Sequence, residues 1–290
     1  MTVSAIELSS TAPFTRRELF IWFAAILVAT KFFQSVLVVS GLSVWDHLFI
    51  QAMGMGAFQL LAWYAVFRLL AREPSDAGAT RQDFAVMGLL AVVNIVLGAI
   101  NVVPTQRVIW IVATLAAIYI FTTSAKGSYA RAAATVLLAL CAQALWGPVF
   151  FSLFALDLLR GDAILVGTLL DATRSGYTWH DNIIETQGHG IEIYGNCSSF
   201  HNVSLSVLCW VTLTKLSRPN WIPSDFIFGA AVCVTMIAAN VARLYVAALS
   251  YTSYVYWHNG FGAHIFQVGV SVMILLIGLW GSSIRGPRHA

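Results

Sequence analysis

Long apolar runs alternate with short polar breaks along the chain. A helix of about 20 apolar residues crosses a hydrocarbon core of roughly 30 Å, and eight runs approach or exceed that length. We therefore predict transmembrane helices near residues 19–40, 48–71, 84–103, 108–124, 132–157, 197–216, 224–246 and 260–282. Only the stretch NVVPTQR, with Pro104 as its breaker, divides the third helix from the fourth. These two form a predicted tight hairpin, and seven helices is the alternative count.

The composition supports a membrane protein. Hydrophobic residues make up 59% of the chain and charged residues 10%, against about 25% charged in soluble domains. We predict an all-α membrane protein, a polytopic bundle in which residues 1–290 form one integral membrane domain. The net charge of +3 is spread thinly, without a run of Lys and Arg, so the lipid bilayer is an expected partner and nucleic acid is not.

Basic residues predict the orientation in the membrane, because Lys and Arg in loops resist translocation. Lys31 lies inside the first helix and is not counted. With a cytoplasmic N-terminus, the basic loop residues inside are Arg16, Arg17, Arg68, Arg72, Arg81, Lys126, Arg131, Lys215, Arg218, Arg285 and Arg288. Those outside are Arg107, Arg160, Arg174 and Arg243. This asymmetry favours an even number of helices, a multi-pass protein of the cytoplasmic (inner) membrane, and both termini in the cytoplasm.

One long loop, residues 158–196, falls on the outside just before the sixth helix. It opens with GDAILVGTLLDATRSG, whose apolar positions predict a short interfacial helix. The later part is polar and rich in glycine, and its apolar Ile191 and Ile193 alternate with Glu192 and Tyr194. This alternation favours a short extended piece or a hairpin.

Three chemically active side chains are predicted at the outer membrane boundary. Cys197 stands at the N-terminus of the sixth helix. Asn240 and Arg243 lie one turn apart on one face of the seventh helix, near its outer end. An aromatic stretch typical of the membrane interface follows, and His258 then opens the eighth helix. Three helix ends are thus expected to bring a cysteine, an arginine and a histidine to one level.

These residue types suit acyl transfer. A thiolate attacks carbonyl groups, and its ordinary pKa of about 8.5 falls beside a cation or at a helix N-terminus. His258 could accept the thiol proton and return it to the leaving amine. Arg243 could stabilise the oxyanion, because a donor aimed at that charge contributes a few kcal/mol where water is excluded. No cofactor is expected.

Each residue also has a non-catalytic explanation. Cys197 could be a small buried side chain, like the cysteines at 141, 209 and 233. Arg243 could extend to the outer headgroups, and His258 could be an interfacial histidine. Asn240 could hydrogen-bond between helices, and Gly262 could allow close packing. The presence of all three residue types at one predicted membrane level favours catalysis over these separate explanations.

The outer loop offers a rival site. Its candidate ligands for zinc or another divalent ion are His180, Asp181, Glu185, His189, Glu192 and His201. Their spacing fits no standard ligand pattern, so no metal is expected, and substrate binding or orientation of His258 is the favoured role. Glu192 is the leading candidate. A transporter would require more charges inside helices than Lys31 and Asp157 supply.

The sequence resembles the exosortase/archaeosortase family of polytopic membrane cysteine transpeptidases, over about residues 130 to 282. The resemblance rests on three motifs in the family's order: Cys197-Ser198-Ser199, then Asn240-Val241-Ala242-Arg243, then His258-Asn259-Gly260-Phe261-Gly262. The family usually has Cys-Ser-Gly at the first motif, where this chain has a second serine. Residues 1–130 match as generic helices, and 131–282 carry the motifs.

The resemblance implies a membrane cysteine peptidase or transpeptidase that cleaves the C-terminal sorting tail of secreted proteins through a thioester. Cys197, Arg243 and His258 would be catalytic, with Asn240, Ser198, Glu192 and Gly262 supporting catalysis or binding substrate. The substrates would carry a short motif, a hydrophobic helix and a basic tail, and the acceptor is unknown. A link to polysaccharide export is one expected context. The alternatives are a non-catalytic component of an export machine and a metal-dependent membrane hydrolase that uses the outer loop.

Overall fold

The structure of the protein is a computed structural model. It describes residues 14–37, 56–76, 78–99, 105–173, 176–185, 190–258 and 260–283. Several sequence predictions lie outside these ranges: the start of the helix expected at 48–71, the breaker Pro104, the loop residue His189 and the C-terminal basic residues Arg285 and Arg288.

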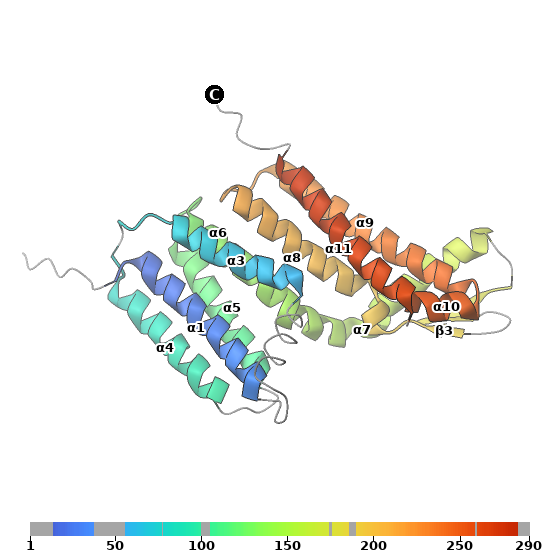
Figure 1. Ribbon diagram of the computed structural model, residues 1–290, viewed down its shortest axis with the longest axis horizontal. Helices are drawn as coiled ribbons and strands as arrows, with labels where there is room; N and C mark the ends of the chain where they lie inside the picture. The colour runs from blue at the N-terminus through green and yellow to red at the C-terminus, as the bar shows by residue number, and fades with distance from the viewer. Residues whose placement is uncertain are drawn as a thin grey trace, which may run out of the picture. The chain divides into compact units, whose positions relative to one another are not determined.

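Helices account for most of the described chain (Figure 1). Those of the first half are α1 (Arg16–Leu37), α3 (Ala57–Arg72), α4 (Arg81–Ala99), α5 (Thr105–Thr123) and α6 (Tyr129–Cys141). Those of the second half are α7 (Gly147–Thr173), α8 (Ser199–Ser217), α9 (Pro223–Ala248), α10 (Tyr251–His258) and α11 (Phe261–Ser283). The predicted all-α class is confirmed, and the helices coincide with the apolar runs.

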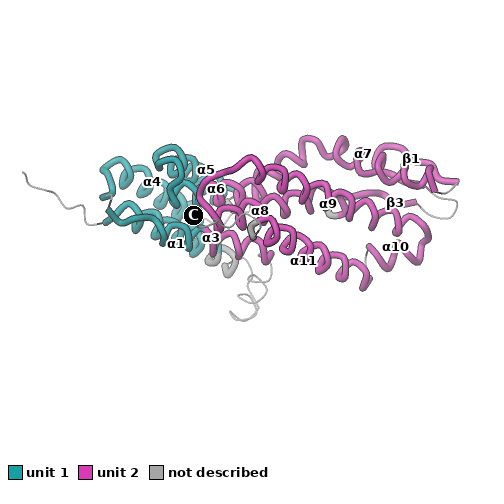
Figure 2. Tube along the Cα trace, turned by 90° about the horizontal axis from the view of Figure 1, so that it is seen from above, with its two compact units in different colours: residues 1–55, 66–134 teal, residues 56–65, 135–290 magenta. Residues whose placement is uncertain are grey.

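The chain divides into two compact units (Figure 2), which are described separately. The first comprises residues 1–55 and 66–134, and the second comprises residues 56–65 and 135–290. In the first unit α4 packs against both α1 and α5, as the predicted hairpin requires. Buried Asp83 joins these three helices, because its carboxylate accepts hydrogen bonds from Arg16 and Tyr119 at 3.2 and 2.9 Å. The prediction of a single integral domain stays a prediction.

The predicted loop boundary at residue 158 is wrong, because α7 continues to Thr173. A π-helical turn, Ala142–Trp146, joins α6 to α7, and Phe154 then departs from helical geometry at φ −120° and ψ 22°. The sequence predicts a separate interfacial helix beyond this point. The kink at Phe154 does divide α7 into two helical parts, and the second part follows the first without an intervening loop and ends at Thr173.

The polar part of the long loop that is predicted to lie outside does form extended structure. Strands β1 (Thr178–His180), β2 (Ile183–Glu185) and β3 (Gly190–Glu192) make an antiparallel sheet in the order β1-β2-β3. Ile191 and Ile193 point into the protein, whereas Glu192 and Tyr194 are exposed, so the predicted alternation is confirmed. The buried side packs with apolar residues of α7 and the end of α9. This core lies directly around Cys197.

Among the described residues, four helical segments are long and apolar enough to cross a membrane: Arg81–Ala99, Tyr129–Thr173, Pro223–Ala248 and Phe261–Gly281. Arg107–Thr123 is a shorter apolar helix. Large apolar side chains are exposed along these helices, as expected of surfaces in contact with lipid. The protein is a polytopic membrane protein, and the count of eight spans stays a prediction.

Gly167 provides a test of the packing between α7 and the sheet. A Cβ at this position would lie 2.3 Å from Cδ1 of Trp179 on β1. We expect Gly167→Ala to lower the free energy of unfolding by about 1–3 kcal/mol, because overpacking forces the neighbours to shift. Gly161→Ala on the same helix is the control, since its Cβ would meet nothing within 4 Å. Chemical unfolding in detergent measures both, and equal stability of the two variants would contradict the packing described.

Candidate active site

Cys197 lies in a turn that leads into α8. A 3-10 helix, η2 (Gly195–Cys197), precedes α8, so the cysteine lies two residues before the helix rather than in its first turn. Its backbone N–H donates to the Tyr194 carbonyl at 2.8 Å. Only 6% of the residue is exposed, and it packs within the core beneath the sheet. The turn therefore fixes the backbone of a largely buried thiol.

His258 meets this thiol from a distant part of the sequence. The imidazole Nδ1 is 3.2 Å from Cys197 Sγ, which is within hydrogen-bonding distance for sulfur. The sequence predicted that His258 opens the final helix, and this is wrong. The aromatic stretch before His258 forms the short helix α10, and His258 is its last residue. Tyr254, one turn earlier on α10, stacks on the imidazole with ring centroids 4.8 Å apart. The tyrosine ring thus restricts the orientation of the histidine.

Asn240 and Arg243 approach Cys197 from α9, one turn apart as predicted. Asn240 Nδ2 donates to the Cys197 carbonyl at 2.8 Å, and Arg243 Nη2 donates to the same oxygen at 3.2 Å. Arg243 Nη2 also donates to Asn240 Oδ1 at 2.9 Å. The guanidinium carbon lies 4.6 Å from the ring centre of Phe266 on α11. Its buried Nε has no hydrogen-bond partner among the described residues.

Ser199, where the family usually has glycine, is the first residue of α8. Asp181 is the only non-glycine among the described residues with positive φ, so position 199 does not require glycine. Ser199 Oγ accepts a hydrogen bond from Asn240 Nδ2 at 3.1 Å. The neighbouring Ser198 donates its hydroxyl to the Gly195 carbonyl at 3.0 Å, which closes the turn.

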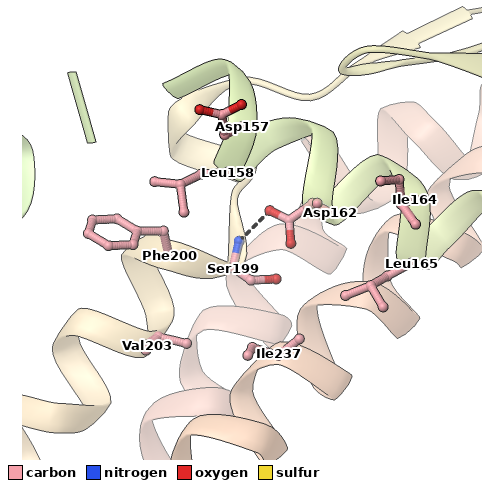
Figure 3. A pocket seen from close by; sticks show the side chains of 10 residues that line it. Asp157, Leu158, Asp162, Ile164, Leu165, Ser199, Phe200, Val203 and Ile237 are labelled. Atoms are coloured by element: carbon pink, nitrogen blue, oxygen red, sulfur yellow. Dashed lines mark hydrogen bonds between the residues drawn. The ribbon is translucent and has the colours of Figure 1, made fainter. Parts of the chain in front are cut away.

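Asp162 is a residue of this site that the sequence analysis missed. It lies on α7, is 5% exposed, and its Oδ2 accepts the Ser199 N–H at 2.8 Å (Figure 3). The signal was present, because a carboxylate within the apolar stretch GDAILVGTLL requires a partner. The sequence predicts an interfacial helix for this stretch, where a carboxylate can remain solvated.

The chain matches the family described as transmembrane exosortase (Exosortase_EpsH) over residues 45–278. The chain belongs to the exosortase family. The match begins at residue 45, so it includes helices that the motif-based resemblance had left generic. Exosortases are membrane cysteine transpeptidases that act on C-terminal sorting signals. No curated protein and no solved structure matches this chain.

Burial governs the charge state of the reactive pair in this exosortase. Burial raises the pKa of the Cys197 thiol, and the nearby positive charge of Arg243 offsets part of that rise. Burial also lowers the pKa of His258, and the Arg243 charge lowers it further. The sequence analysis expected a lowered thiol pKa. Instead, the resting pair near neutral pH is a thiol beside an uncharged imidazole, which can accept the thiol proton.

Two other predicted residues lie on the edge of this arrangement. Glu192 is exposed on β3, and its carboxylate accepts a hydrogen bond from the Tyr194 hydroxyl at 2.5 Å. Its role in substrate binding stays a prediction. Gly262 lies in the first turn of α11, where a Cβ would approach the Tyr256 ring to 2.5 Å. This glycine is therefore needed for the packing of α11 against the helix that carries His258.

The rival metal ligands do not form a cluster in the described chain. Within its described ranges, no three His, Cys, Asp or Glu side chains are placed to share a metal ion. His180 is on β1, Asp181 is in the turn between β1 and β2 with φ 47°, and His201 is on α8.

A pocket of about 460 Å³ adjoins the start of α8. Figure 3 shows its lining from α7, α8 and α9, including Leu158, Phe200 and Ile237. Asp162 and Ser199 also line it. The pocket therefore borders the segment that follows Cys197.

The charge states predict how Cys197 reacts with iodoacetamide. Because the thiol pKa is raised, we expect the alkylation rate to keep rising from about pH 6 to beyond the ordinary thiol pKa of about 8.5. His258→Ala should slow the reaction about tenfold or more near neutral pH, since the proton acceptor is lost. Mass spectrometry of the Cys197 peptide measures the rate. A plateau that begins below pH 6 would instead indicate a preformed thiolate–imidazolium pair.

Proposed function

We propose that this exosortase cleaves the C-terminal sorting tail of secreted proteins, with Cys197 as nucleophile, His258 as acid and base, and Arg243 as oxyanion stabiliser. The observation that carries the proposal is the distance of 3.2 Å between Cys197 Sγ and His258 Nδ1. The two residues are 61 positions apart in sequence, and Arg243 lies beside them. A contact between a nucleophile and a base is the geometry that activates a thiol.

The reaction would proceed in two acyl transfers. Nδ1 of His258 takes the thiol proton as Sγ attacks the scissile carbonyl carbon, and an oxyanion forms. The C–N bond then breaks, His258 returns the proton to the leaving amine, and a thioester remains on Cys197. An acceptor amine or hydroxyl, or water, next attacks the thioester. It loses its proton to His258, and the thiol is regenerated.

Arg243 has a donor available for the oxyanion. Its Nη2 is engaged with the Cys197 carbonyl and with Asn240. Its buried Nε lacks a hydrogen-bond partner in the described part of the chain, so this N–H can bind a new acceptor without breaking an existing bond. The positive charge in a site that is largely closed to water would stabilise the oxyanion further.

The depth of the site in the membrane limits which substrates can reach it. Cys197 precedes α8, whereas Lys215 and Arg218 lie at the opposite end of that helix. The predicted orientation places these cations in the cytoplasm and the thiol at the outer boundary. A bond near the outer end of a membrane-spanning tail would be within reach. The proposed substrate therefore carries a short motif, a hydrophobic helix and a basic cytoplasmic tail.

Processing of secreted proteins tests these roles. We expect Cys197→Ala to abolish cleavage of sorting tails, because the proposed thioester forms on the Cys197 sulfur. Arg243→Lys should lower the rate by about 10²-fold, since it keeps a charge but lacks the guanidinium Nε donor. Intact mass spectrometry of secreted proteins from cells that carry each variant measures the cleaved fraction.

Cys233→Ala is the matched control, because this partly exposed cysteine of α9 lies outside the proposed site. It should process substrates at the normal rate. Normal processing by Cys197→Ala would overturn the catalytic proposal and would favour a non-catalytic component of an export machine.

A further inference from the structure

Asp162 is a buried carboxylate that the two acyl transfers do not use. It is 5% exposed within α7, and its Oδ2 accepts the backbone N–H of Ser199 at 2.8 Å. Figure 3 shows the carboxylate aimed at this N–H from the facing helix. Burying a carboxylate costs free energy unless hydrogen bonds or charges compensate it. A carboxylate buried in this way therefore needs a reason that apolar packing cannot give.

The N–H that Asp162 binds would otherwise lack an acceptor. The first N–H groups of a helix have no partner within the helix, and a side chain at the N-cap position commonly supplies one. Ser198 is the N-cap of α8, but it makes no capping hydrogen bond and its hydroxyl donates to Gly195 instead. Asp162 supplies the missing acceptor from α7. A negative charge at a helix N-terminus is also favourable.

The segment 197–199 is consequently held from two sides. From α9, Asn240 donates to the Cys197 carbonyl at 2.8 Å and to Ser199 Oγ at 3.1 Å. From α7, Asp162 accepts from the Ser199 backbone. These contacts fix the backbone on which the Cys197 thiol is carried, and the thiol must lie within reach of His258, which belongs to α10.

We propose that Asp162 is a positioning residue, which anchors the start of α8 through the Ser199 N–H and so keeps Cys197 against His258. This role matters for catalysis only if the proposed function is right. The contacts of Asp162 themselves do not depend on a substrate. A carboxylate that served folding alone would change the amount of folded protein. A positioning residue also changes how strongly the reactivity of Cys197 depends on His258.

Coupling between the two reactive residues is therefore the quantity to measure. The rate of alkylation of Cys197 by iodoacetamide is determined on purified, folded protein with and without His258→Ala, and the ratio of the two rates gives the coupling. The same pair of measurements is made with Asp162→Ala and with Asp162→Asn. We expect His258→Ala to slow alkylation about tenfold in the otherwise unchanged protein and less than about threefold with Asp162→Ala.

Asp162→Asn should retain the coupling, because its amide oxygen can still accept the Ser199 N–H at nearly the same size. Asp157→Ala is the matched control, since Asp157 is an exposed carboxylate on the same helix and borders the same pocket (Figure 3). It should leave the coupling unchanged. If Asp162→Ala gives no folded protein, Asp162→Leu takes its place, as a side chain of similar branching without an acceptor.

If His258→Ala still slowed alkylation about tenfold in the Asp162→Ala or Asp162→Leu protein, the positioning role would be overturned. A loss of this effect in Asp157→Ala would overturn it as well. The measurement uses no substrate. If Cys197→Ala cells were to process secreted proteins normally, the proposed function would fail while the labelling ratios would still decide the role of Asp162.

Discussion

The hydrogen bond from the Asn240 amide to the Cys197 carbonyl is the contact on which the site depends. Asn240 is fully buried within α9, and a polar group in such surroundings is costly unless it is satisfied. Its amide nitrogen serves Cys197 and Ser199, and its oxygen accepts from Arg243. One side chain thereby sets the relative positions of the Cys197 backbone, the start of α8 and the Arg243 guanidinium. Most polar groups around Asn240 thus satisfy one another, while the buried Nε of Arg243 has no hydrogen-bond partner among the described residues.

The sequence predicted most helices for reasons that are local, and it also predicted that Cys197, Arg243 and His258 lie close together, as they do. Apolar runs of membrane-spanning length identify helices. Asn240 and Arg243 are one turn apart, so a single helix presents both toward one side. The order of the three motifs then indicated a common site. The contact of Cys197 with His258 could be inferred only from their shared membrane level, because residues 61 positions apart meet through packing that no local pattern encodes.

The features that the sequence analysis missed depend on packing between elements. The second part of α7, which the sequence predicted as a separate interfacial helix, packs beneath the sheet and follows the first part directly. Asp162 lies on that continuation, so the error in the helix boundary concealed the acceptor for Ser199. The raised pKa of Cys197 was missed for a related reason. Proximity to a cation and to a helix start is visible in a sequence, whereas burial beneath β3 is not.

The near-complete enclosure of Cys197 bears on the fate of the proposed thioester. With 6% of the residue exposed, bulk water has little direct access to an acyl group on its sulfur. Spontaneous hydrolysis would then be slow, and the lifetime of the acyl-enzyme would depend on how readily an acceptor enters beside His258. The acyl group would either be released as a free carboxylate or be joined to another molecule. Access of water or acceptor to the site would decide between these outcomes more than the intrinsic reactivity of the thioester.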